Sequence, residues 1–356
     1  MKNDSDIQTL KKRLQEKGLS DSFCLMPFTT LNLQPDGTVS VCRHKGTDFV
    51  VGSLKENSLA EIWNGPKLQA WREEFLSGNI KTCKWEIENL SCHQCSLINS
   101  LWDKAQLETQ VDTILRFGAN LNGLCNLQCR MCNVWTQESG LYDKRNYWPL
   151  MKKNLLPYLE VIELFSGEPF LQQDTFRLSQ TMAEVNPSCR WFITTNGQFD
   201  VSEEVSQFLT NTNIHHLYFS LDTLDPEQYQ AIRRGGELER TLQTMEEICQ
   251  FYKDHPELKR PTIGINFLMM KDNYEQIPIV QSYANQLGVE FSLGVLQRPK
   301  QFSLMEQSLE VRLKALDFLF NYSKNTENLS HRVITSLLHS LPIAERKAFL
   351  FKNAAK

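Results

Sequence analysis

Residues 121–135 read LNGLCNLQCRMCNVW and place three cysteines close together, Cys125, Cys129 and Cys132, in a Cys-x3-Cys-x2-Cys pattern. A structural zinc site is a closed tetrahedron of four protein ligands, whereas three thiolates leave one position of a metal or cluster open. The stretch therefore predicts a metal centre with one position for a molecule that is not protein. It also follows directly on a predicted strand, as the first loop of a repeated strand and helix pattern.

The composition is that of a globular protein. The chain has 356 residues, 41% of them hydrophobic and 22% charged, which suits one large domain and one smaller one. The net charge of -4 predicts no general attraction to nucleic acid or to an anionic membrane surface. The N-terminus lacks the apolar core of a signal peptide, and no segment is apolar enough to span a bilayer. We therefore expect a cytoplasmic protein, in which reduced cysteines serve as metal ligands.

From about Val111 onward, apolar β-branched segments alternate with longer amphipathic ones. This alternation is typical of β-α units with a parallel sheet, and six units favour an open barrel over a closed barrel of eight. The predicted strands are residues 113–121, 161–167, 190–197, 215–222, 262–270 and 288–296. The predicted fold class is α/β, with an open (β/α)6 partial TIM-type barrel at 111–302, a small Cys-rich β-hairpin and helix domain at 1–110, and a helical extension at 303–356.

Reactive side chains follow four consecutive predicted strands. In barrels of parallel strands, the chemistry gathers on the loops after the carboxyl ends of the strands. After the first strand comes the cysteine triad, and the next three strand ends carry Ser166, Gly167, Glu168 and Pro169, then Asn196, then Ser220 and Asp222. These groups are expected at a single mouth. Ordinary capping of the strand ends is the alternative for the amide, the hydroxyl and the aspartate.

Two motifs in order resemble the radical S-adenosylmethionine (radical SAM) superfamily. The triad has that family's spacing, and SGEP at 166–169 is similar to its Gly-Gly-Glu-Pro motif. The resemblance implies that the triad holds a 4Fe-4S cluster by three irons, while the fourth iron binds the amino and carboxylate groups of S-adenosylmethionine. It also implies reductive cleavage of S-adenosylmethionine, hydrogen abstraction from a substrate, and a low-potential electron donor such as flavodoxin or ferredoxin.

Within this resemblance, the other strand-end residues contact S-adenosylmethionine. Glu168 accepts a hydrogen bond from the methionyl ammonium, and Gly167 lets the backbone approach closely. Arg233 either reaches the carboxylate of S-adenosylmethionine or faces solvent. The residues expected at the ribose or the carboxylate are Asn196, Ser220 and Asp222.

The chain departs from the family pattern at two positions. Ser166 replaces the first glycine of the glutamate motif, and Met131 stands before the third cysteine, where the family often has an aromatic residue. Serine is small enough to preserve the turn, and methionine can pack on an adenine ring. We therefore expect catalysis to be retained. A structural zinc site or an incidental group of thiols is the alternative reading of the triad.

A second set of cysteines precedes residue 100. The segment 23–42, FCLMPFTTLNLQPDGTVSVC, joins two of them through a Pro-Asp-Gly turn and predicts a β-hairpin that brings them near one another. The region resembles the auxiliary-cluster domains called SPASM and twitch, which usually follow the barrel but precede it here. The resemblance implies a second 4Fe-4S cluster held by Cys24, Cys42, Cys92 and Cys95, with Cys83 as either a ligand or a spare thiol.

Zinc is the alternative for these N-terminal cysteines, because four cysteines with one Cys-x-x-Cys pair also form structural zinc sites. Beside a radical SAM barrel, iron-sulfur is favoured. The large aromatic residues of this region, Phe28, Trp63 and Trp71, are expected in the core of the small domain. Two isolated cysteines, Cys189 and Cys249, are expected to be small buried hydrophobic residues.

Two classes of function remain open. One is an enzyme that abstracts hydrogen, and the other is a non-catalytic iron-sulfur scaffold or electron carrier. The glutamate motif favours the enzyme, because an electron carrier needs no site for an ammonium group. Resemblance to SPASM and twitch proteins implies a peptide or protein substrate first, and a sugar or aminocyclitol-type small molecule second.

Overall fold

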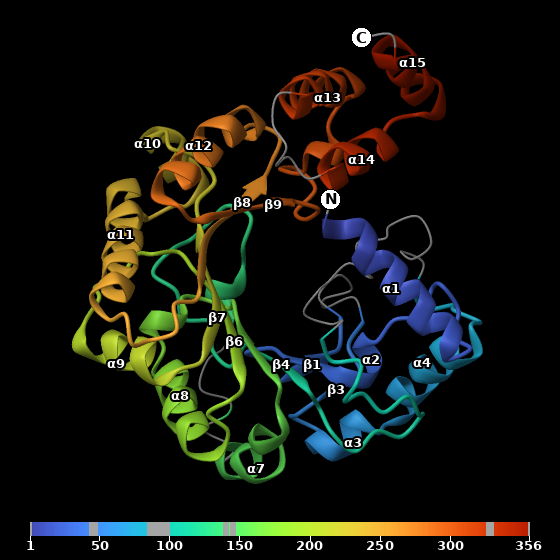
Figure 1. The fold of residues 1–356 in the computed structure, drawn as a ribbon, viewed down its shortest axis with the longest axis vertical. Coiled ribbons are helices and arrows are strands. Elements are labelled where there is room, and N and C mark those ends of the chain that lie inside the picture. Colours follow the sequence, from blue (N-terminus) through green and yellow to red (C-terminus); the bar gives the residue numbers. More distant parts are fainter. Residues whose placement is uncertain are drawn as a thin grey trace. The chain divides into compact units, whose positions relative to one another are not determined.

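The computed structural model describes residues 2–42, 49–83, 100–137, 142, 147–324 and 331–354, with only the backbone described at 2–7, 331–332 and 354. The predicted ligands Cys92 and Cys95 lie outside these ranges. In Figure 1 the chain alternates strand and helix from β4 to β9. None of the helices within the described ranges has the length and apolar character needed to cross a membrane.

All six predicted barrel strands are present, and three further strands precede them. The strands are β1 Thr30–Leu33, β2 Thr38–Ser40, β3 Gly52–Ser53, β4 Arg116–Ala119, β5 Val161–Leu164, β6 Arg190–Thr195, β7 Ile214–Ser220, β8 Thr262–Met269 and β9 Glu290–Val295. They form one nine-stranded sheet in the order β3-β2-β1-β4-β5-β6-β7-β8-β9. The α/β fold class and the mostly parallel sheet are therefore confirmed.

Helices connect these strands and form the C-terminal region. They are α1 Lys2–Glu16, α2 Met26–Thr29, α3 Leu59–Trp63, α4 Pro66–Ser77, α7 Tyr147–Asn154, α8 Gln173–Val185, α9 Glu203–Asn211, α10 Pro226–Ile232, α11 Leu238–Asp254, α12 Ile277–Leu287, α13 Leu309–Lys324, α14 His331–His339 and α15 Ile343–Ala354. Short 3-10 turns occur at η3 Val134–Thr136, η4 Leu156–Tyr158, η5 Pro169–Leu171, η6 Tyr274–Gln276 and η7 Leu304–Glu306. Asp225 caps α10, because its carboxylate accepts from the Gln228 amide at 2.8 Å.

The chain divides into two compact units. The first comprises residues 1–124, 136–192 and 207–214, and the second comprises 125–135, 193–206 and 215–356. The first unit contains β1 to β5, whereas the second contains the cysteine triad, β8 and β9. The boundary between the units crosses β6 and β7, so each unit consists of segments that are separated in the sequence. The predicted domain boundaries at residues 110 and 302 stay predictions.

The N-terminal hairpin is joined to the barrel sheet, which the sequence does not indicate. Strands β1 and β2 are antiparallel, and Asp36 closes their turn by accepting from the Thr38 amide at 2.9 Å. The other edge of β1 pairs with β4 in parallel, with Thr30 beside Arg116 and Leu33 beside Ala119. An edge strand carries unpaired backbone groups, and this pairing satisfies those of β4. Cys24 lies before α2 and not on a hairpin strand.

The predicted aromatic core of the N-terminal region is confirmed, because Phe28, Trp63 and Trp71 are all buried. The two isolated cysteines, Cys189 and Cys249, are also buried as predicted.

A buried arginine ties together this N-terminal core. The Arg72 guanidinium donates to the Pro27 carbonyl at 2.9 Å and to Asn64 Oδ1 and the Thr109 carbonyl at 3.0 Å each. Its carbon Cζ lies 4.5 Å from the centre of the Trp63 ring, a cation–π contact. Burial lowers the pKa of Arg72 to about 10, so the group remains charged at neutral pH.

Arg72→Met should lower the free energy of unfolding by about 2–3 kcal/mol, because it leaves buried acceptors without a donor. Denaturant unfolding followed by circular dichroism measures this change. Lys67→Met, at an exposed position of the same helix, is the matched control and should change the free energy by less than about 0.5 kcal/mol. Equal effects of the two substitutions would contradict the proposed role of Arg72.

Candidate metal and cofactor site

The cysteine triad lies on a loop of the second unit that is hydrogen-bonded to the segment after α10. The Gln128 amide donates to the Arg234 carbonyl at 2.9 Å, and the Arg130 amide donates to the Ile232 carbonyl at 3.0 Å. This antiparallel contact holds the loop along both sides of Cys129. The triad is therefore placed by backbone pairing as well as by its own turn, in which the Cys132 amide donates to the Cys129 carbonyl at 3.0 Å.

Two glycines make this approach of the backbones possible. Gly235 has φ +88°, and a Cβ there would lie 3.4 Å from the Asn126 carbonyl oxygen. A Cβ on Gly236 would lie 3.1 Å from Leu127 Cδ2. The sequence pattern indicates the first arginine of this RRGG segment, residues 233–236, but not its glycines. Their function becomes visible only when the segment is seen beside the triad.

Each of the three sulfur atoms accepts a hydrogen bond. The donors are the Leu127 amide to Cys125 Sγ at 3.4 Å, Asn196 Nδ2 to Cys125 Sγ at 3.7 Å, Arg233 Nη1 to Cys129 Sγ at 4.0 Å, and the Val134 amide to Cys132 Sγ at 3.5 Å. Hydrogen bonds of this kind stabilise the thiolate over the thiol and tune the potential of an iron-sulfur cluster. The environment therefore suits anionic sulfur ligands.

The triad does not form a site for a single metal ion in this structure. No three His, Cys, Asp or Glu side chains in the described ranges converge on one ion position. In a cubane cluster each cysteine binds a different iron, so its ligands do not converge on one atom. Burial raises the pKa of the Cys129 thiol, against the opposing charge of Arg233.

Arg233 and Asp222 form a buried ion pair beside Cys129. Arg233 Nη2 lies 2.7 Å from Asp222 Oδ2, and the two side chains are 8% and 0% exposed. The second oxygen of Asp222 accepts from the Leu268 amide at 2.8 Å. Burial acts to lower the pKa of Arg233, but the Asp222 carboxylate outweighs it and the pKa is raised. A permanent positive charge therefore lies next to the triad, and Arg233 does not face solvent.

The remaining predicted site residues of the second unit occupy different positions. Asn196 directs its amide to Cys125 and also donates to Asn126 Oδ1 at 3.0 Å. Ser220 ends β7 and is half-buried. Met131 packs against the buried cluster of Ile232, Met270 and Leu296. The binding roles predicted for these residues stay predictions.

A pocket of about 580 Å³ adjoins the triad within the second unit. It is lined by Arg130, Met131, Cys132, Asn133, Arg298, Pro299 and Lys300. The Arg130 guanidinium makes a two-pronged ion pair with Asp272, and its Nη1 lies 2.9 Å from Asp272 Oδ2. It also lies over the Phe302 ring, 4.8 Å from the centre. Arg130, for which the sequence carries no signal, therefore anchors the triad loop to the segments that follow β8 and β9.

In the first unit, the SGEP turn is fastened to the residues that precede Cys125. The Ser166 hydroxyl donates to the Asn122 carbonyl at 3.1 Å, so serine supports the turn that its small size was expected to permit. The Glu168 amide donates to the Leu124 carbonyl at 2.9 Å. The Glu168 side chain is fully buried, and it accepts from the Phe170 amide at 3.2 Å at the start of the 3-10 turn that Pro169 begins.

Gly167 and Gln172 make this contact close. Gly167 has φ +61°, and a Cβ there would lie 2.2 Å from the Leu124 carbonyl oxygen, so no other residue fits. Gln172 Nε2 donates to the carbonyls of Leu124 at 3.0 Å and Ser166 at 2.9 Å. The sequence carries no signal for Gln172, because a glutamine after a proline turn is ordinary. Its function depends on which carbonyls the fold brings to it.

The predicted N-terminal ligands are only partly described. Cys42 directly follows the hairpin and is buried, while Cys24 and Cys83 are half-buried. Cys92 and Cys95 lie outside the described residues. The ligand set of a second cluster therefore stays a prediction.

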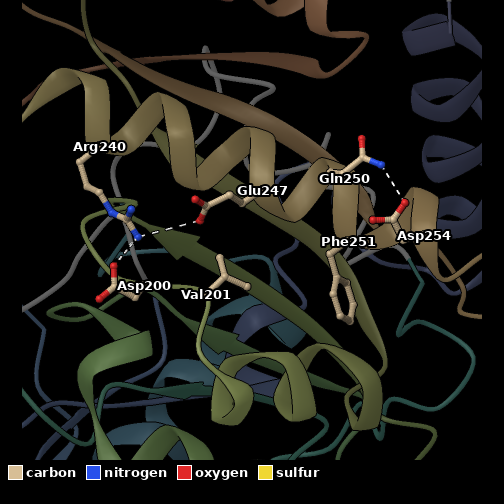
Figure 2. Close-up of a pocket in the computed structure, with 7 residues that line it drawn as sticks. All are labelled: Asp200, Val201, Arg240, Glu247, Gln250, Phe251 and Asp254. Carbon is tan, nitrogen blue, oxygen red and sulfur yellow. Dashed lines mark hydrogen bonds and ion pairs between the residues drawn. The ribbon is translucent and has the colours of Figure 1, made fainter.

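A second pocket of about 520 Å³ lies between α11 and the segment after β6, in the second unit (Figure 2). Figure 2 shows Arg240 reaching both Asp200, at 2.7 Å, and Glu247, at 3.9 Å. Gln250 donates to Asp254 at 2.7 Å. The charged groups drawn there bind one another, and no predicted site residue lines this pocket.

Two family models match the chain. The model described as an iron-sulfur cluster-binding domain, SPASM, matches residues 24–96, and that of the radical SAM superfamily matches residues 120–278. The first match includes all five N-terminal cysteines, and the second includes the triad and the SGEP motif.

Curated relatives resemble about half of the chain. A probable GTP 3',8-cyclase of Methanococcus maripaludis strain C7 is 28% identical over 178 residues, which are 49% of this chain and 56% of that protein. The tungsten-containing aldehyde ferredoxin oxidoreductase cofactor-modifying protein of Pyrococcus furiosus is 30% identical over 178 residues, 48% of each chain. The chain thus spans about half the length of these relatives. The structure of Streptococcus suis SuiB bound to precursor peptide SuiA covers 85% of this chain and 70% of that one at 16% identity and a TM-score of 0.45.

Gly167→Ala should lower the stability of the first unit more than Gly18→Ala does. Both glycines have similar positive φ values, +61° and +66°, but only Gly167 has atoms where a Cβ would lie. We expect the difference in unfolding free energy to be at least about 1–2 kcal/mol, because the added carbon overlaps the Leu124 carbonyl. Denaturant unfolding of the two variants measures it. Equal losses would show that the turn yields to the extra carbon.

Proposed function

Because the chain belongs to the radical SAM superfamily and carries a SPASM iron-sulfur cluster-binding domain, we propose that it modifies a peptide or protein by abstracting hydrogen from it. It is an enzyme whose cofactors are a 4Fe-4S cluster, S-adenosylmethionine and auxiliary iron-sulfur. The observation that carries the proposal is a cysteine triad whose three sulfurs accept hydrogen bonds, in a chain whose SGEP glutamate is fully buried.

In the proposal, Cys125, Cys129 and Cys132 hold the first cluster. When bound, this cluster and S-adenosylmethionine supply reductive cleavage of the sulfonium and hydrogen abstraction. Arg233, charged through its pair with Asp222, stabilises the thiolate of Cys129 and so favours the reduced cluster. Asp222 is then a positioning residue, in place of the ribose contact that the sequence predicts for it. Removing one partner of such a buried pair is strongly unfavourable.

In the proposal, Glu168 accepts a hydrogen bond from the methionyl ammonium of S-adenosylmethionine. The pocket beside Cys132 binds its adenosine group. A carboxylate shielded from water makes a strong charge-assisted hydrogen bond. A pocket of about 580 Å³ is within the range for a ligand of this size. Met131 lines it and is held from behind by an apolar cluster, so its thioether is positioned to pack on a purine.

The N-terminal cysteines are proposed to hold an auxiliary 4Fe-4S cluster, with Cys24, Cys42, Cys92 and Cys95 as ligands and Cys83 as a further candidate. The family match to an iron-sulfur domain supports iron-sulfur over zinc. We propose a cytoplasmic location, in which thiols stay reduced and can bind metal, with flavodoxin or ferredoxin as the class of electron donor.

A small molecule is the second candidate substrate. The GTP 3',8-cyclase relatives favour a purine nucleotide, and a sugar or aminocyclitol remains a further alternative. A non-catalytic scaffold would load clusters but form no 5'-deoxyadenosine. Anaerobic reduction with S-adenosylmethionine therefore separates enzyme from scaffold.

Anaerobically reconstituted protein should contain about eight irons, two cubane clusters. Cys125→Ala should lose one cluster and all cleavage of S-adenosylmethionine, because a ligand is missing. Cys189→Ala, which changes a buried cysteine outside the predicted ligand sets, should keep the irons and the cleavage. Iron analysis and chromatography of 5'-deoxyadenosine measure both. Stoichiometric zinc with iron never above about four would refute the auxiliary cluster.

Glu168→Gln should keep both clusters and weaken S-adenosylmethionine binding by about 10- to 100-fold, because it removes the charge from a charge-assisted hydrogen bond. Equilibrium binding to the loaded protein measures the change. Glu184→Gln is the control, since that glutamate is exposed and pairs with Lys152 at 2.6 Å. Equal affinity of the two variants for S-adenosylmethionine would contradict the proposed role of Glu168.

A further inference from the structure

Strands β1, β4 and β5 of the first unit have one apolar face and one polar face. The register places Leu31, Phe117 and Ile162 in one row across the three strands. The next residues along each strand, Asn32, Gly118 and Glu163, form a row on the opposite face. Every residue of the three strands is buried. A buried polar row in a sheet is unusual and calls for partners.

Two charged residues on the polar face, Arg116 and Glu163, form an ion pair with each other. Arg116 Nη2 and Nε lie 2.6 and 2.8 Å from Glu163 Oε2, and the two side chains are 2% and 4% exposed. The pair contributes no net charge to the face. Arg116 Nη1, however, is buried without a hydrogen-bond partner in the described part of the chain. The guanidinium therefore retains one buried donor nitrogen without a partner among the described residues.

The side chain of Asn32 is buried without a hydrogen-bond partner in the described ranges. It is 2% exposed, and neither its amide nitrogen nor its oxygen finds a hydrogen bond among the described residues. Exchanging the two atoms changes nothing, because both are orphaned. The amide lies over Gly118, where a Cβ would be 2.3 Å from Asn32 Oδ1. Glycine at that position therefore makes room for the side chain.

Asn120 adds a second acceptor to the same region. It lies two residues beyond Gly118, is 3% exposed, and its Oδ1 has no hydrogen-bond partner within the described ranges. Asn120 is also five residues before Cys125 in the sequence. The polar face thus ends where the loop to the triad begins.

We propose that this face is a substrate subsite that binds a neutral amide, such as a backbone peptide group. The inference rests on the proposed function and narrows its substrate class. The orphaned groups are two donors, Asn32 Nδ2 and Arg116 Nη1, and two acceptors, Asn32 Oδ1 and Asn120 Oδ1. A peptide group carries a C=O that can accept from a donor such as Asn32 Nδ2. Its N–H lies on the opposite side and can donate to an acceptor such as Asn120 Oδ1.

Charge argues against ionic groups at this subsite. A carboxylate or phosphate would place its negative charge beside two amide oxygens, and the Arg116–Glu163 pair supplies no net charge to balance it. An ammonium would likewise find no net negative charge on this face, because Glu163 is paired with Arg116. Because buried unpaired charges are far more costly than buried neutral dipoles, a neutral donor and acceptor group is preferred.

The subsite joins the two family-matched regions of the chain. Asn32 lies within the SPASM match at 24–96, whereas Asn120 is the first residue of the radical SAM match at 120–278. Asn32 lies on β1, and Asn120 directly follows β4, the strand that pairs in parallel with β1 (Figure 1). The N-terminal region would therefore contribute directly to substrate binding, in addition to its cluster.

Crystals of the full chain soaked separately in N-methylacetamide, acetate and glycerol test the proposal. N-methylacetamide carries one peptide group, and we expect it to bind between the Asn32 amide and Asn120 Oδ1. The same soak of Asn32→Leu crystals should leave the position without it. Water alone in all soaks, or acetate or glycerol in preference to the amide, would overturn the proposal.

Thermal unfolding provides a second measurement. Asn273 is also fully buried, but its amide is fully bonded, to the Asp222 and Leu268 carbonyls and the Met270 amide. Asn273→Leu should therefore lower the melting temperature by several degrees, whereas Asn32→Leu should leave it unchanged or raise it. A comparable loss in Asn32→Leu would make Asn32 a structural residue and overturn the subsite.

The outcomes separate this inference from the proposed function. Wild-type protein that forms 5'-deoxyadenosine but holds only water at Asn32 would refute the subsite alone. Wild-type protein that binds N-methylacetamide at Asn32 and never forms 5'-deoxyadenosine would refute the enzyme and support the subsite as a binding site.

Discussion

The Leu124 carbonyl is the contact on which the arrangement of the SGEP turn depends. It accepts from the Glu168 amide and from Gln172 Nε2, and it lies so close to Gly167 that a side chain there is excluded. Leu124 is also the residue before the first cysteine of the triad. The turn after β5 is thereby bound to the residue that precedes the triad in the sequence. The buried Glu168 is held by two backbone contacts, from its own amide to Leu124 and from the Phe170 amide to its carboxylate.

In the second unit, two arginine ion pairs hold the loop that carries the cysteine triad. A single arginine, Arg233, pairs with the fully buried Asp222 and still directs a donor to Cys129. The Asp222 carboxylate also accepts from the Leu268 amide of β8. The Arg233 guanidinium is therefore held between Cys129 and an aspartate that is itself bound to the sheet. Arg130 performs a corresponding function on the outer side of the loop through Asp272. Two arginines therefore position the loop, one from within the unit and one near its surface.

The parallel pairing of β1 with β4 places the N-terminal hairpin in the same sheet as the barrel strands. A hairpin that the sequence presents as part of a separate domain is an extension of the barrel sheet, and its polar face continues across β4 and β5. The orphaned amide of Asn32 is buried because of this pairing. A cluster-binding region attached through a sheet can hold the substrate as well as an auxiliary cluster, and the two functions need not be distinguished by domain.

The sequence by itself determined the chemistry and the strands. Cysteine spacing, the SGEP motif and six apolar segments are local patterns, so they identify a radical SAM barrel without knowledge of any long-range contact. Only the tertiary structure decided what lies beside these patterns. The partners of Asp222, the clip made by Gln172, the glycines of the RRGG segment and the pairing of β1 with β4 all join residues that are distant in the chain or ordinary in type. Their significance arises from packing, because a hydrogen bond between remote residues leaves no periodicity in the sequence.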